Sequence, residues 1–437
     1  MSFDAKAKEI TAEVHIPGEI AFDNLSSLET KINELEKSQA VATLFLENIL
    51  RAGLDLSSSD IHFEPEKEKI KIRFRIDGML YPAGGLSLKS YERLLNRIKL
   101  LSGMKLNIGG TGQDGRFTVS DGTDIEIRAS INPSEFGETV VLRILNPETI
   151  GLDLAVLGLR KDDEAIIRAE LGKPNGMILV TGPTGSGKTT TLYAFLKEVR
   201  TPEIKIITIE DPIEYRLEGV QQTQVDLEAG YTFDNGLRSI LRQDPDVILV
   251  GEIRDLPTAE IASQASLTGH LVFSTLHTND AIGAIPRLIA LGVKPPTIGP
   301  ALNLVVAQRL VRKLCEKCRE KIEQTEGFKE KMKQFVSRLP SRVDRNIYNL
   351  SSASPYRAKG CEFCQAGYKG RTGIYELFLV DRRIDPLITE KVTEAAIEKA
   401  ISEDYIPLQA DGLLKAISGI TSLEEVERVT GPLKWGD

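Results

Sequence analysis

The sequence predicts an α/β protein in which a parallel β-sheet, covered on both faces by helices, is joined to a smaller N-terminal α/β domain. The second half of the chain alternates short, nearly all apolar segments with helical stretches, as buried parallel strands and their crossover helices do. The region before it alternates apolar and charged residues with a period of two, which is typical of half-buried strands. At 437 residues the chain also exceeds what one hydrophobic core normally supports, so we expect two domains with small attachments.

The composition is that of an ordinary globular protein, with 41% hydrophobic and 27% charged residues. A net charge of -8 provides no overall basic surface of the kind that nucleic-acid-binding proteins carry, so no nucleic-acid partner is expected. The longest apolar runs, Met177–Val180 and Val247–Val250, are far shorter than the roughly 20 residues that cross a bilayer. The start at Met1 is polar and does not resemble a signal peptide, so we expect a cytoplasmic protein.

The N-terminal part divides into a polar segment and a domain. Residues 1–37 are polar without a sustained period, and we interpret them as a linker or the stub of something larger. From Val41 apolar residues recur at helical spacing, which predicts an amphipathic helix that Gly53 closes. Residues 38–150 form the predicted N-terminal domain.

Strands are predicted in the rest of that domain. Ile70–Ile76 alternates apolar and basic residues, and Asp77-Gly78 after it predicts a hairpin turn. Asp124–Ile131 and Thr139–Leu145 are two further strand-like runs. The arginines on these strands are Arg75, Arg128 and Arg143. Each alone is most simply a solvated residue on the outer face of the sheet, but three on one sheet leave a functional role open.

The second domain begins after a connector that we place at residues 151–161, where strands begin to alternate with helices. The parallel sheet is predicted over residues 162–312. Its expected strands are Met177–Thr181, Ile204–Ile209, Val247–Val250 and Leu271–Ser274. Helices are expected after Lys188, over Asp234–Arg242 and over Thr258–Leu267.

A glycine-rich loop carries the most specific signal. It reads Gly182-Pro183-Thr184-Gly185-Ser186-Gly187-Lys188-Thr189 and fits G-x-x-x-x-G-K-[ST], directly after an apolar strand and before a helix. Such glycines let backbone N–H groups point at phosphate oxygens, and the helix adds its positive end. We expect Lys188 to reach the β- and γ-phosphates of ATP and Thr189 to bind Mg²⁺, with Thr190 beside them. A chance glycine-rich turn is the alternative.

Two carboxylates follow apolar strands, at the edge where open α/β sheets bind ligands. Glu252 comes after the strand Val247–Val250, which places it to hold Mg²⁺ directly or through water. Glu210 ends another predicted strand, and we assign it the role of orienting or deprotonating the attacking water. Capping of the next segment is the alternative for Glu210.

Two histidines bracket a further strand. The run Ser274–Asn279 contains several hydrogen-bond donors where a γ-phosphate would be sensed. We interpret His277 as a phosphate sensor and His270 as a second nucleotide contact, because both lie at the ends of this strand. A satisfied polar residue without a function is the alternative for either.

The four cysteines form two pairs, Cys315-x-x-Cys318 and Cys361-x-x-Cys364. In a reducing cytoplasm this spacing favours a metal over disulfides, and four thiolates predict a closed, structural Zn²⁺ site. Four unrelated buried thiols are the alternative. The span 319–360 between the pairs is expected to loop out, within a zinc subdomain over 313–374, and 375–437 to form a C-terminal helical region.

These motifs resemble those of the type II secretion and type IV pilus assembly ATPases from about Ser38 to the C-terminus. Gly182–Thr189 resembles the Walker A loop of that family, and Asp246–Glu252 resembles its Walker B strand. Ile209–Glu214 is similar to its Asp box, and Thr268–His277 is similar to its His box. The cysteine pairs are similar to its zinc-binding subdomain.

The resemblance implies a RecA-like core, a PAS-like N-terminal domain, and a hexameric motor that hydrolyses Mg-ATP. It implies that Arg128 and Arg143 approach the nucleotide, as arginine fingers do elsewhere, with Arg75 and Arg238 as further candidates. It also implies a homohexamer that docks on an inner-membrane platform protein and touches the membrane only peripherally.

We therefore expect a motor that powers type IV pilus assembly at the inner membrane. Type II secretion is the alternative with the same chemistry, a nucleic-acid translocase is the alternative of another class, and an ATP-binding scaffold without turnover is a third. The expected catalytic residues are Lys188, Glu210, Glu252, Arg128, Arg143 and His277, and water attacks the γ-phosphate directly. Replacing Glu210 with glutamine is expected to keep binding and abolish turnover.

Overall fold

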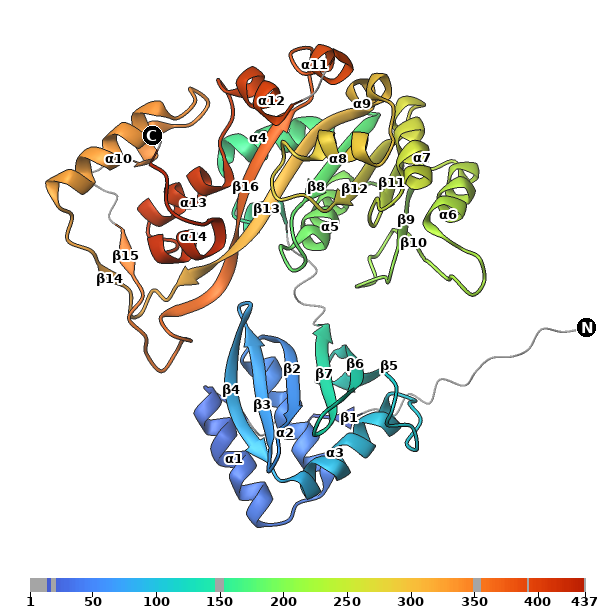
Figure 1. Cartoon of the computed structure of the whole chain (residues 1–437), viewed down its shortest axis with the longest axis vertical. Coiled ribbons are helices and arrows are strands. Elements are labelled where there is room, and N and C mark those ends of the chain that lie inside the picture. Colours follow the sequence, from blue (N-terminus) through green and yellow to red (C-terminus); the bar gives the residue numbers. More distant parts are fainter. Residues whose placement is uncertain (1–13, 17–20, 146–152, 349–354, 391–392, 436–437) are drawn as a thin grey trace, which may run out of the picture. The chain divides into compact units, whose positions relative to one another are not determined.

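The computed structural model describes residues 14–16, 21–145, 153–348, 355–390 and 393–435, which form two compact units (Figure 1). The first unit comprises residues 1–149 and the loop 360–366, and the second comprises residues 150–359 and 367–437. None of the helices in these described ranges has the length and apolar character needed to span a membrane.

The first unit, as far as its residues are described, is a seven-stranded sheet with helices packed on one face. The strand order is β1-β5-β6-β7-β2-β3-β4; β1 pairs with β5 in parallel and the other neighbours are antiparallel. The strands are β1 (Val14–His15), β2 (Ser58–Pro65), β3 (Ile70–Ile76), β4 (Met79–Leu86), β5 (Gln113–Ser120), β6 (Asp124–Ser134) and β7 (Gly137–Leu145). The helices are α1 (Leu25–Lys37), α2 (Ala42–Asp55) and α3 (Leu88–Leu101).

The period of two decides which face of this sheet is buried. In β3 the apolar residues Ile70, Ile72, Phe74 and Ile76 lie in the core with the helices, and the basic residues between them face away. The predicted strands and the hairpin turn after β3 are confirmed, and both turn residues have positive φ, as this turn requires. The PAS-like relationship of the unit stays a prediction.

The interpretation of residues 1–37 as a polar linker is wrong for residues 25–37. These residues form α1, which Asn24 caps and which buries Leu28, Ile32 and Leu35 in the core of the first unit. These three residues are four and three positions apart, as on the apolar face of a helix. The strongly polar residues between them hide this pattern in the sequence. The first domain therefore begins before residue 38.

The helix that starts after Val41 continues past its expected end. Gly53 lies inside α2, which ends at Asp55. A Cβ at position 53 would lie 2.7 Å from Ile144 Cδ1 and 3.0 Å from Ile61 Cδ1, so glycine here allows the helix to approach the sheet closely. Gly53 is thus a packing residue and not a helix terminator.

The second unit is built on another seven-stranded sheet within the described residues, in the order β10-β9-β11-β12-β8-β13-β16. All neighbours are parallel except β13 and β16. The strands are β8 (Gly176–Thr181), β9 (Ile206–Glu210), β10 (Gln221–Gln224), β11 (Val247–Val250), β12 (Leu271–Leu276), β13 (Leu302–Leu314) and β16 (Tyr368–Leu379). The four strands predicted for the parallel sheet are confirmed.

Helices cover both faces of this sheet, as predicted (Figure 1). On one face pack the short helix η2 (Leu154–Val156), α4 (Lys161–Leu171) and α5 (Lys188–Val199). On the other pack α6 (Phe233–Ile240), α7 (Leu256–Leu267), α8 (Ala284–Ala290), α9 (Pro295–Ala301), α11 (Asp385–Glu390) and α12 (Glu394–Ile401). The short helix η3 (Leu241–Gln243) follows α6. The three helices expected from the sequence are confirmed within a few residues.

The expected connector at 151–161 is too long at its C-terminal side. Residues 151 and 152 lie outside the described residues, but Leu154 and Leu157 are buried in the core of the second unit. The carbonyl oxygen of Leu157 accepts hydrogen bonds from the N–H of Gly373 and the hydroxyl of Tyr375. The segment therefore packs as part of the second unit.

The expected end of the sheet domain at residue 312 is too early. β13 continues to Leu314, and β16 pairs with it along most of its length. The boundary expected at 374/375, between the zinc subdomain and the C-terminal helical region, falls inside β16. Pairing of β13 with β8 reaches only Ala307, so the rest of β13 forms a two-stranded antiparallel ribbon with β16. The ribbon was not predicted because its two strands lie far apart in the sequence.

The segment between the cysteine pairs does not loop out as expected. It contains α10 (Glu326–Arg338) and η4 (Arg345–Tyr348), and its ends pair as β14 (Glu320–Lys321) with β15 (Tyr356–Arg357). Met332 and Phe335 of α10 share a core with α13 (Leu408–Ile417), α14 (Leu423–Thr430) and Trp435. The insertion thus packs on the C-terminal helices.

Candidate active site

The loop Gly182–Thr189 joins β8 to α5 with the geometry of a phosphate-binding loop. Gly182, Gly185 and Gly187 have φ values of +146°, +78° and +89°. A Cβ at Gly182 would lie 2.5 Å from the carbonyl oxygen of Gln308, so no larger residue fits there. Helix α5 begins at Lys188, so its free N–H groups and positive end adjoin the loop. Pro183, Thr184, Gly185 and Thr189 are exposed, Thr190 is half-buried, and Ser186 is buried.

The ammonium group of Lys188 bends back over this loop. It donates hydrogen bonds to the carbonyl oxygens of Gly182 at 2.9 Å and Pro183 at 3.1 Å. Burial lowers the pKa of Lys188, and the nearby carboxylate of Glu252 raises it in part. Lys188 is therefore held where phosphate oxygens can replace the loop carbonyls as its hydrogen-bond acceptors.

Glu252 and His277 lie together at the same edge of the sheet. Glu252 follows β11 and its side chain is 13% exposed, with Oε2 3.5 Å from His277 Nε2 and Oε1 paired with Arg254. The turn after β11 is tied to β12, because Thr275 donates through Oγ1 to the carbonyl oxygen of Gly251. Three strand ends thus bring Lys188, Glu252 and His277 to one place, and the roles expected of them stay predictions.

Glu210 does not occupy the position expected of a free catalytic base. Its carboxylate is 3% exposed and accepts hydrogen bonds from Tyr193 of α5, Thr208 and Gln222. Burial raises the pKa of Glu210, and the three hydrogen bonds lower it in part. No helix starts within the described residues that directly follow it, so the capping alternative is wrong as well. Both oxygens have donors, so Glu210 joins the P-loop helix to the edge strands.

His270 lies at the wrong end of its strand for a contact with this loop. It precedes Leu271, which pairs with Gly176 at the start of β8, whereas Leu276 pairs with Thr181 at the end. At about 3.3 Å per residue, His270 is roughly 20 Å from the nucleotide edge. Its ring Nδ1 lies 3.0 Å from the carbonyl oxygen of Ala265. The assignment of His270 to the nucleotide site of its own sheet is therefore wrong.

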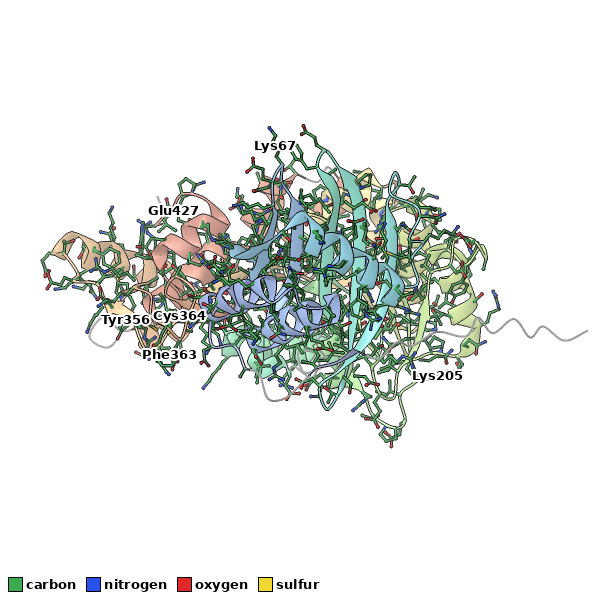
Figure 2. All side chains as sticks on the ribbon, turned by 90° about the horizontal axis from the view of Figure 1, so that it is seen from below. Lys67, Lys205, Tyr356, Phe363, Cys364 and Glu427 are labelled. Atoms are coloured by element: carbon green, nitrogen blue, oxygen red, sulfur yellow. The ribbon has the colours of Figure 1, made fainter. Side chains whose placement is uncertain are left out.

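Arg238, a predicted nucleotide contact, and Asp246, the first residue of the segment that resembles Walker B, each interact with other residues. Arg238 is an exposed residue in the last turn of α6, and its charge acts on Asp234 one turn earlier. Asp246 stands before β11, where its carboxylate accepts the backbone N–H of Lys205 at 2.7 Å. Lys205 itself is exposed (Figure 2). Asp246 thus lies at the opposite end of β11 from Glu252, and the nucleotide contact of Arg238 stays a prediction.

Gln308 of β13 is a residue of the site that sequence reasoning missed. Its side chain is 1% exposed, and its Nε2 donates to the carbonyl oxygen of Ser186 at 2.7 Å. The hydrogen bond fixes the middle of the loop against the neighbouring strand. No local pattern could have revealed this role, because Gln308 lies far from the loop in the sequence.

Four arginines of the first unit lie in one row across its sheet. Cross-strand registers pair Arg116 with Arg128, Arg128 with Arg143, Arg143 with Asp60, and Asp60 with Arg75. Asp60 accepts from Arg143 Nε at 3.0 Å and lies 3.4 Å from Arg75 Nε. All belong to the face opposite the helices, which gives that face a concentrated positive charge.

The four cysteines lie together as predicted. Their sulfur atoms are all within 4.8 Å of one another, and none forms a disulfide. In each pair the fourth residue donates its N–H to the carbonyl oxygen of the first, which turns both sulfurs inward. The Sγ atoms of Cys361 and Cys364 are 3.6 Å apart, close to the roughly 3.8 Å expected between ligands of tetrahedral zinc. Phe363 and Cys364 of this turn are labelled in Figure 2. The four thiols could hold one metal ion.

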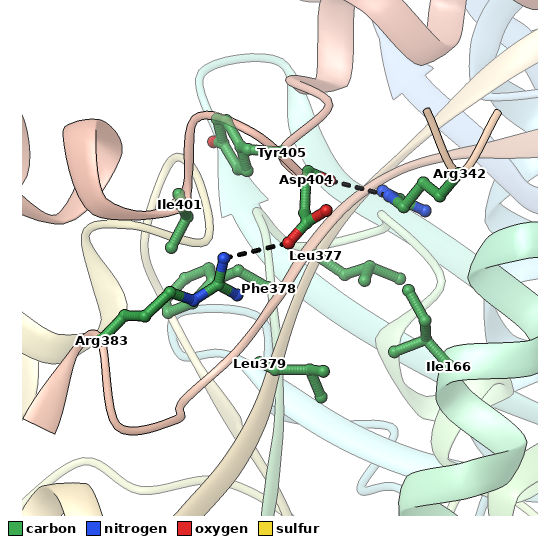
Figure 3. A pocket seen from close by; sticks show the side chains of 9 residues that line it. All are labelled: Ile166, Arg342, Leu377, Phe378, Leu379, Arg383, Ile401, Asp404 and Tyr405. Atoms are coloured by element: carbon green, nitrogen blue, oxygen red, sulfur yellow. Dashed lines mark hydrogen bonds and ion pairs between the residues drawn. The ribbon is translucent and has the colours of Figure 1, made fainter. Parts of the chain in front are cut away.

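A pocket of about 210 Å³ lies elsewhere in the second unit, between β16, α4 and the end of α12 (Figure 3). Its charged side chains are already engaged: Arg383 donates to Asp404 at 3.0 Å, and Arg342 donates to the carbonyl oxygen of Asp404 at 2.7 Å. Leu377, Phe378 and Leu379 supply much of its wall. It contains no free catalytic group and is not the candidate active site.

Comparison with known families decides what kind of protein carries this loop. Residues 34–428 match the family described as "Type II/IV secretion system protein". The chain belongs to that family.

Relatives of this type II/IV secretion system protein bear two functional names. The "Type II secretion system ATPase E" of Vibrio cholerae is 43% identical over 98% of this chain and 83% of its own length. The "Type II secretion system protein E" of Aeromonas hydrophila is 46% identical, over 87% of this chain and 74% of its own length. The "Type IV pilus assembly ATPase PilB" of Pseudomonas aeruginosa is 41% identical, over 90% and 68%.

Solved structures of ATPases are similar to most of the chain. The pilus retraction motor PilT with bound ADP has a TM-score of 0.58 and 27% identity, and covers 88% of this chain and 96% of its own. The Legionella pneumophila ATPase DotB, at 21% identity with a TM-score of 0.64 over 88% and 95%, shows the fold alone. The type II/IV secretion system protein described here is an ATPase.

Proposed function

We propose that this ATPase is a homohexameric, cytoplasmic motor that docks on an inner-membrane platform protein and drives the assembly of pilin-like subunits. The observation that carries the proposal is the meeting of Lys188, Glu252 and His277 beside a glycine-rich loop. Such a site binds a nucleoside triphosphate and offers charge where the γ-phosphate leaves. Relatives of both names, type II secretion and type IV pilus assembly, support the same kind of work.

In the proposed mechanism, water attacks the γ-phosphate directly. Lys188 neutralises charge that develops on the phosphate oxygens, and His277 senses the γ-phosphate from the end of β12. Thr189 and Glu252 would hold Mg²⁺, which supplies further charge neutralisation when bound. We assign the orientation of the water to Glu252 and not to Glu210, since Glu252 lies beside His277 and its charge acts on Lys188. Glu210 is 3% exposed and is held by Tyr193, Thr208 and Gln222.

The arginine row is the second proposed element of the motor. We propose that Arg128 and Arg143 contact the γ-phosphate of a bound nucleotide, with Arg75 beside them. Their common face and register support this, because one nucleotide could then meet several guanidinium groups at once. Asp60, which is 6% exposed, orients Arg143 and Arg75 from between them.

The machine that this motor serves can be tested genetically. Relatives named for type II secretion match at 41–46% and PilB matches at 41%, so identity does not separate the secretion machine from the pilus expected from the sequence, and we take secretion as the hypothesis to test. Deletion of the gene in its own host should abolish export of secreted proteins and leave pili intact. The wild-type gene should restore export, and the matched Lys188→Ala variant should not, although it is produced at the same level. Loss of pili with normal export would assign the motor to pilus assembly.

We also propose that the four cysteines hold one structural Zn²⁺. All four positions of the tetrahedron are thiolates, so no position remains for a substrate. The purified protein should contain one zinc per chain, and Cys361→Ser should lower both the zinc content and the midpoint of thermal unfolding. Metal content by mass spectrometry checks this, with Ser337→Ala, at an exposed position of α10, as the control. Protein without zinc that unfolds at the same temperature would contradict a structural role.

A further inference from the structure

The loop that follows His277 is fixed by the neighbouring strands of the sheet. β8 holds its first residue, since the N–H of Thr278 donates to Thr181 Oγ1 at 3.0 Å. β13 holds the next, since Arg309 Nη2 donates to the carbonyl oxygen of Asn279 at 3.3 Å. The position of the half-exposed His277 imidazole therefore depends on the hydrogen bonds that hold the loop after it.

Strand β16 holds the same loop through a buried carboxylate. Glu376 is 4% exposed, and its Oε1 accepts the N–H of Ala281 at 2.8 Å. It is in register with Ala307 of β13, and Ala307 is in register with Thr181, the last residue of β8. Glu376 thus stands in the same row of the sheet as the residue that precedes the phosphate loop.

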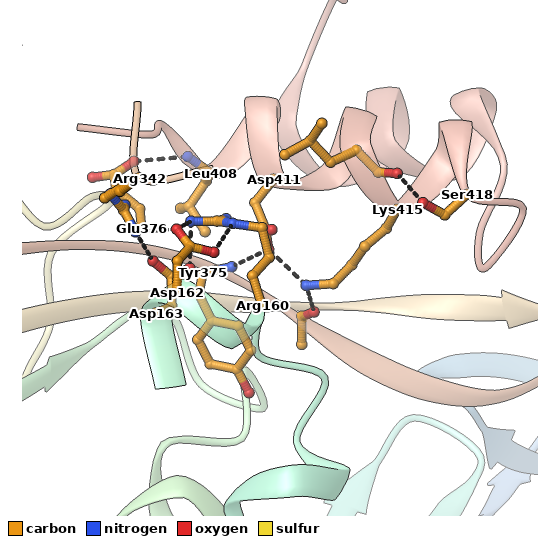
Figure 4. A network of polar contacts seen from close by, with 12 residues as sticks. Arg160, Asp162, Asp163, Arg342, Tyr375, Glu376, Leu408, Asp411, Lys415 and Ser418 are labelled. Carbon is orange, nitrogen blue, oxygen red and sulfur yellow. Dashed lines mark hydrogen bonds and ion pairs between the residues drawn. The ribbon is translucent and has the colours of Figure 1, made fainter. Parts of the chain in front are cut away.

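The other oxygen of this carboxylate reaches the C-terminal helices. Glu376 Oε2 accepts the N–H of Leu408, the first residue of α13, at 3.0 Å (Figure 4). Tyr405, which also lines the pocket of Figure 3, adds a hydrogen bond to Glu376. Burial raises the pKa of Glu376, and the hydrogen bonds lower it in part. Such a group is costly to bury, but here both oxygens have partners.

We propose that Glu376 is a positioning residue of the ATPase, which holds the loop after His277 against the start of α13 and so keeps His277 beside Glu252. The residue does not touch the nucleotide and acts through the backbone of Ala281. The proposal rests on the ATP site and not on the machine that the motor serves. It also gives the C-terminal helices a direct attachment to the loop that carries the γ-phosphate sensor.

Glu376→Gln is the sharpest test of this role. Glutamine keeps the shape of the side chain but presents an NH₂ group to one of the two backbone N–H donors, so one hydrogen bond is lost. We expect kcat for Mg-ATP to fall by about 10- to 100-fold, as small misplacements of catalytic groups do. The KM for ATP should change by less than about twofold, because the phosphate loop is untouched. Steady-state phosphate release on the full chain measures both, and a native kcat would overturn the proposal.

A double-mutant cycle with His277→Ala separates positioning from general stability. If Glu376 acts through His277, adding Glu376→Gln to His277→Ala should lower kcat by less than about twofold further. If the two effects instead multiply, Glu376 does not act through His277 and the proposal fails.

Glu425→Gln is the matched control. Glu425 is also a buried carboxylate, 1% exposed, and accepts a backbone N–H, that of Arg312, at 3.0 Å, but it holds no part of the loop. Glu425→Gln should lower the unfolding temperature while kcat stays native. If Glu425→Gln lowered kcat as much as Glu376→Gln does, the effect of Glu376→Gln would be purely structural.

Should Glu376→Gln fail to fold, Tyr405→Phe removes one hydrogen bond from the same carboxylate. It should then lower kcat about threefold, again only when His277 is present.

Discussion

Replacing Glu252 with glutamine should lower kcat for Mg-ATP hydrolysis by about 10²- to 10⁴-fold, the range typical of a lost acid–base group. Glu252 is the carboxylate whose charge acts on Lys188 and which lies beside His277, and glutamine can neither accept a proton from water nor carry that charge. ATP binding should persist, because the loop and Lys188 remain. Phosphate release and binding of a fluorescent ATP analogue measure the two properties separately.

Glu210→Gln provides the matched control for this prediction. The Glu210 carboxylate is held by Tyr193, Thr208 and Gln222, so its loss should affect mainly the packing of the P-loop helix against the edge strands. We expect kcat to fall less than about 10-fold, together with a lower unfolding temperature. If Glu210→Gln were as slow as Glu252→Gln and just as stable as wild type, Glu210 would regain the catalytic role that its motif suggested.

Asp411→Ala should destabilise the second unit by about 3–5 kcal/mol, the cost of removing one partner from a buried ion pair. Asp411 has no exposed surface, and it accepts hydrogen bonds from Arg160 at 2.6 Å, Lys415 at 2.6 Å and the N–H of Tyr375 at 2.8 Å (Figure 4). Burial alone would raise the pKa of Asp411, but Lys415 and Arg160 lower it below its ordinary value. Alanine would leave two buried cations without their shared carboxylate.

Denaturant unfolding monitored by circular dichroism checks this loss. Lys31→Ala is the control, because Lys31 and Glu34 are an exposed pair on α1 and such pairs contribute little. An Asp411→Ala protein with an unfolding midpoint equal to wild type would mean that Arg160 and Lys415 find other partners. Arg160 also pairs with Asp162 and Asp163, and Lys415 also donates to the carbonyl oxygen of Gly373 at 2.6 Å.

The sequence was most informative where the signal is local. The loop Gly182–Thr189, the strands beside it and the cysteine pairs each follow from a few adjacent residues, because glycine conformation, apolar runs and metal-ligand spacing act over short distances. Strand-end placement located Glu252 and His277 correctly for the same reason. The arginines could be assigned to strands but not to one row, since register depends on the pairing of distant segments.

The errors have equally definite causes. The prediction for His270 is wrong because His270 precedes β12, and in a parallel sheet only the C-terminal ends of the strands face the ligand. The catalytic role of Glu210 stays a prediction: its position along β9 indicates the nucleotide edge, but the groups that hold its carboxylate belong to α5 and β10, which local sequence does not reveal. The fold of the insertion depends on Trp435 and α13, which come much later in the chain.

Strand β13 runs from the phosphate loop to the first pair of cysteines. Gln308, which supports the phosphate loop, and Cys315, the first thiol of the cysteine cluster, are seven residues apart along β13 and its end. At about 3.3 Å per residue this sets a separation of roughly 23 Å. Because the hydrogen-bonded ribbon with β16 cannot stretch appreciably, the separation between Gln308 and Cys315 is nearly fixed. Rearrangements during an ATPase cycle must therefore rotate or bend the β13–β16 ribbon and cannot change its length.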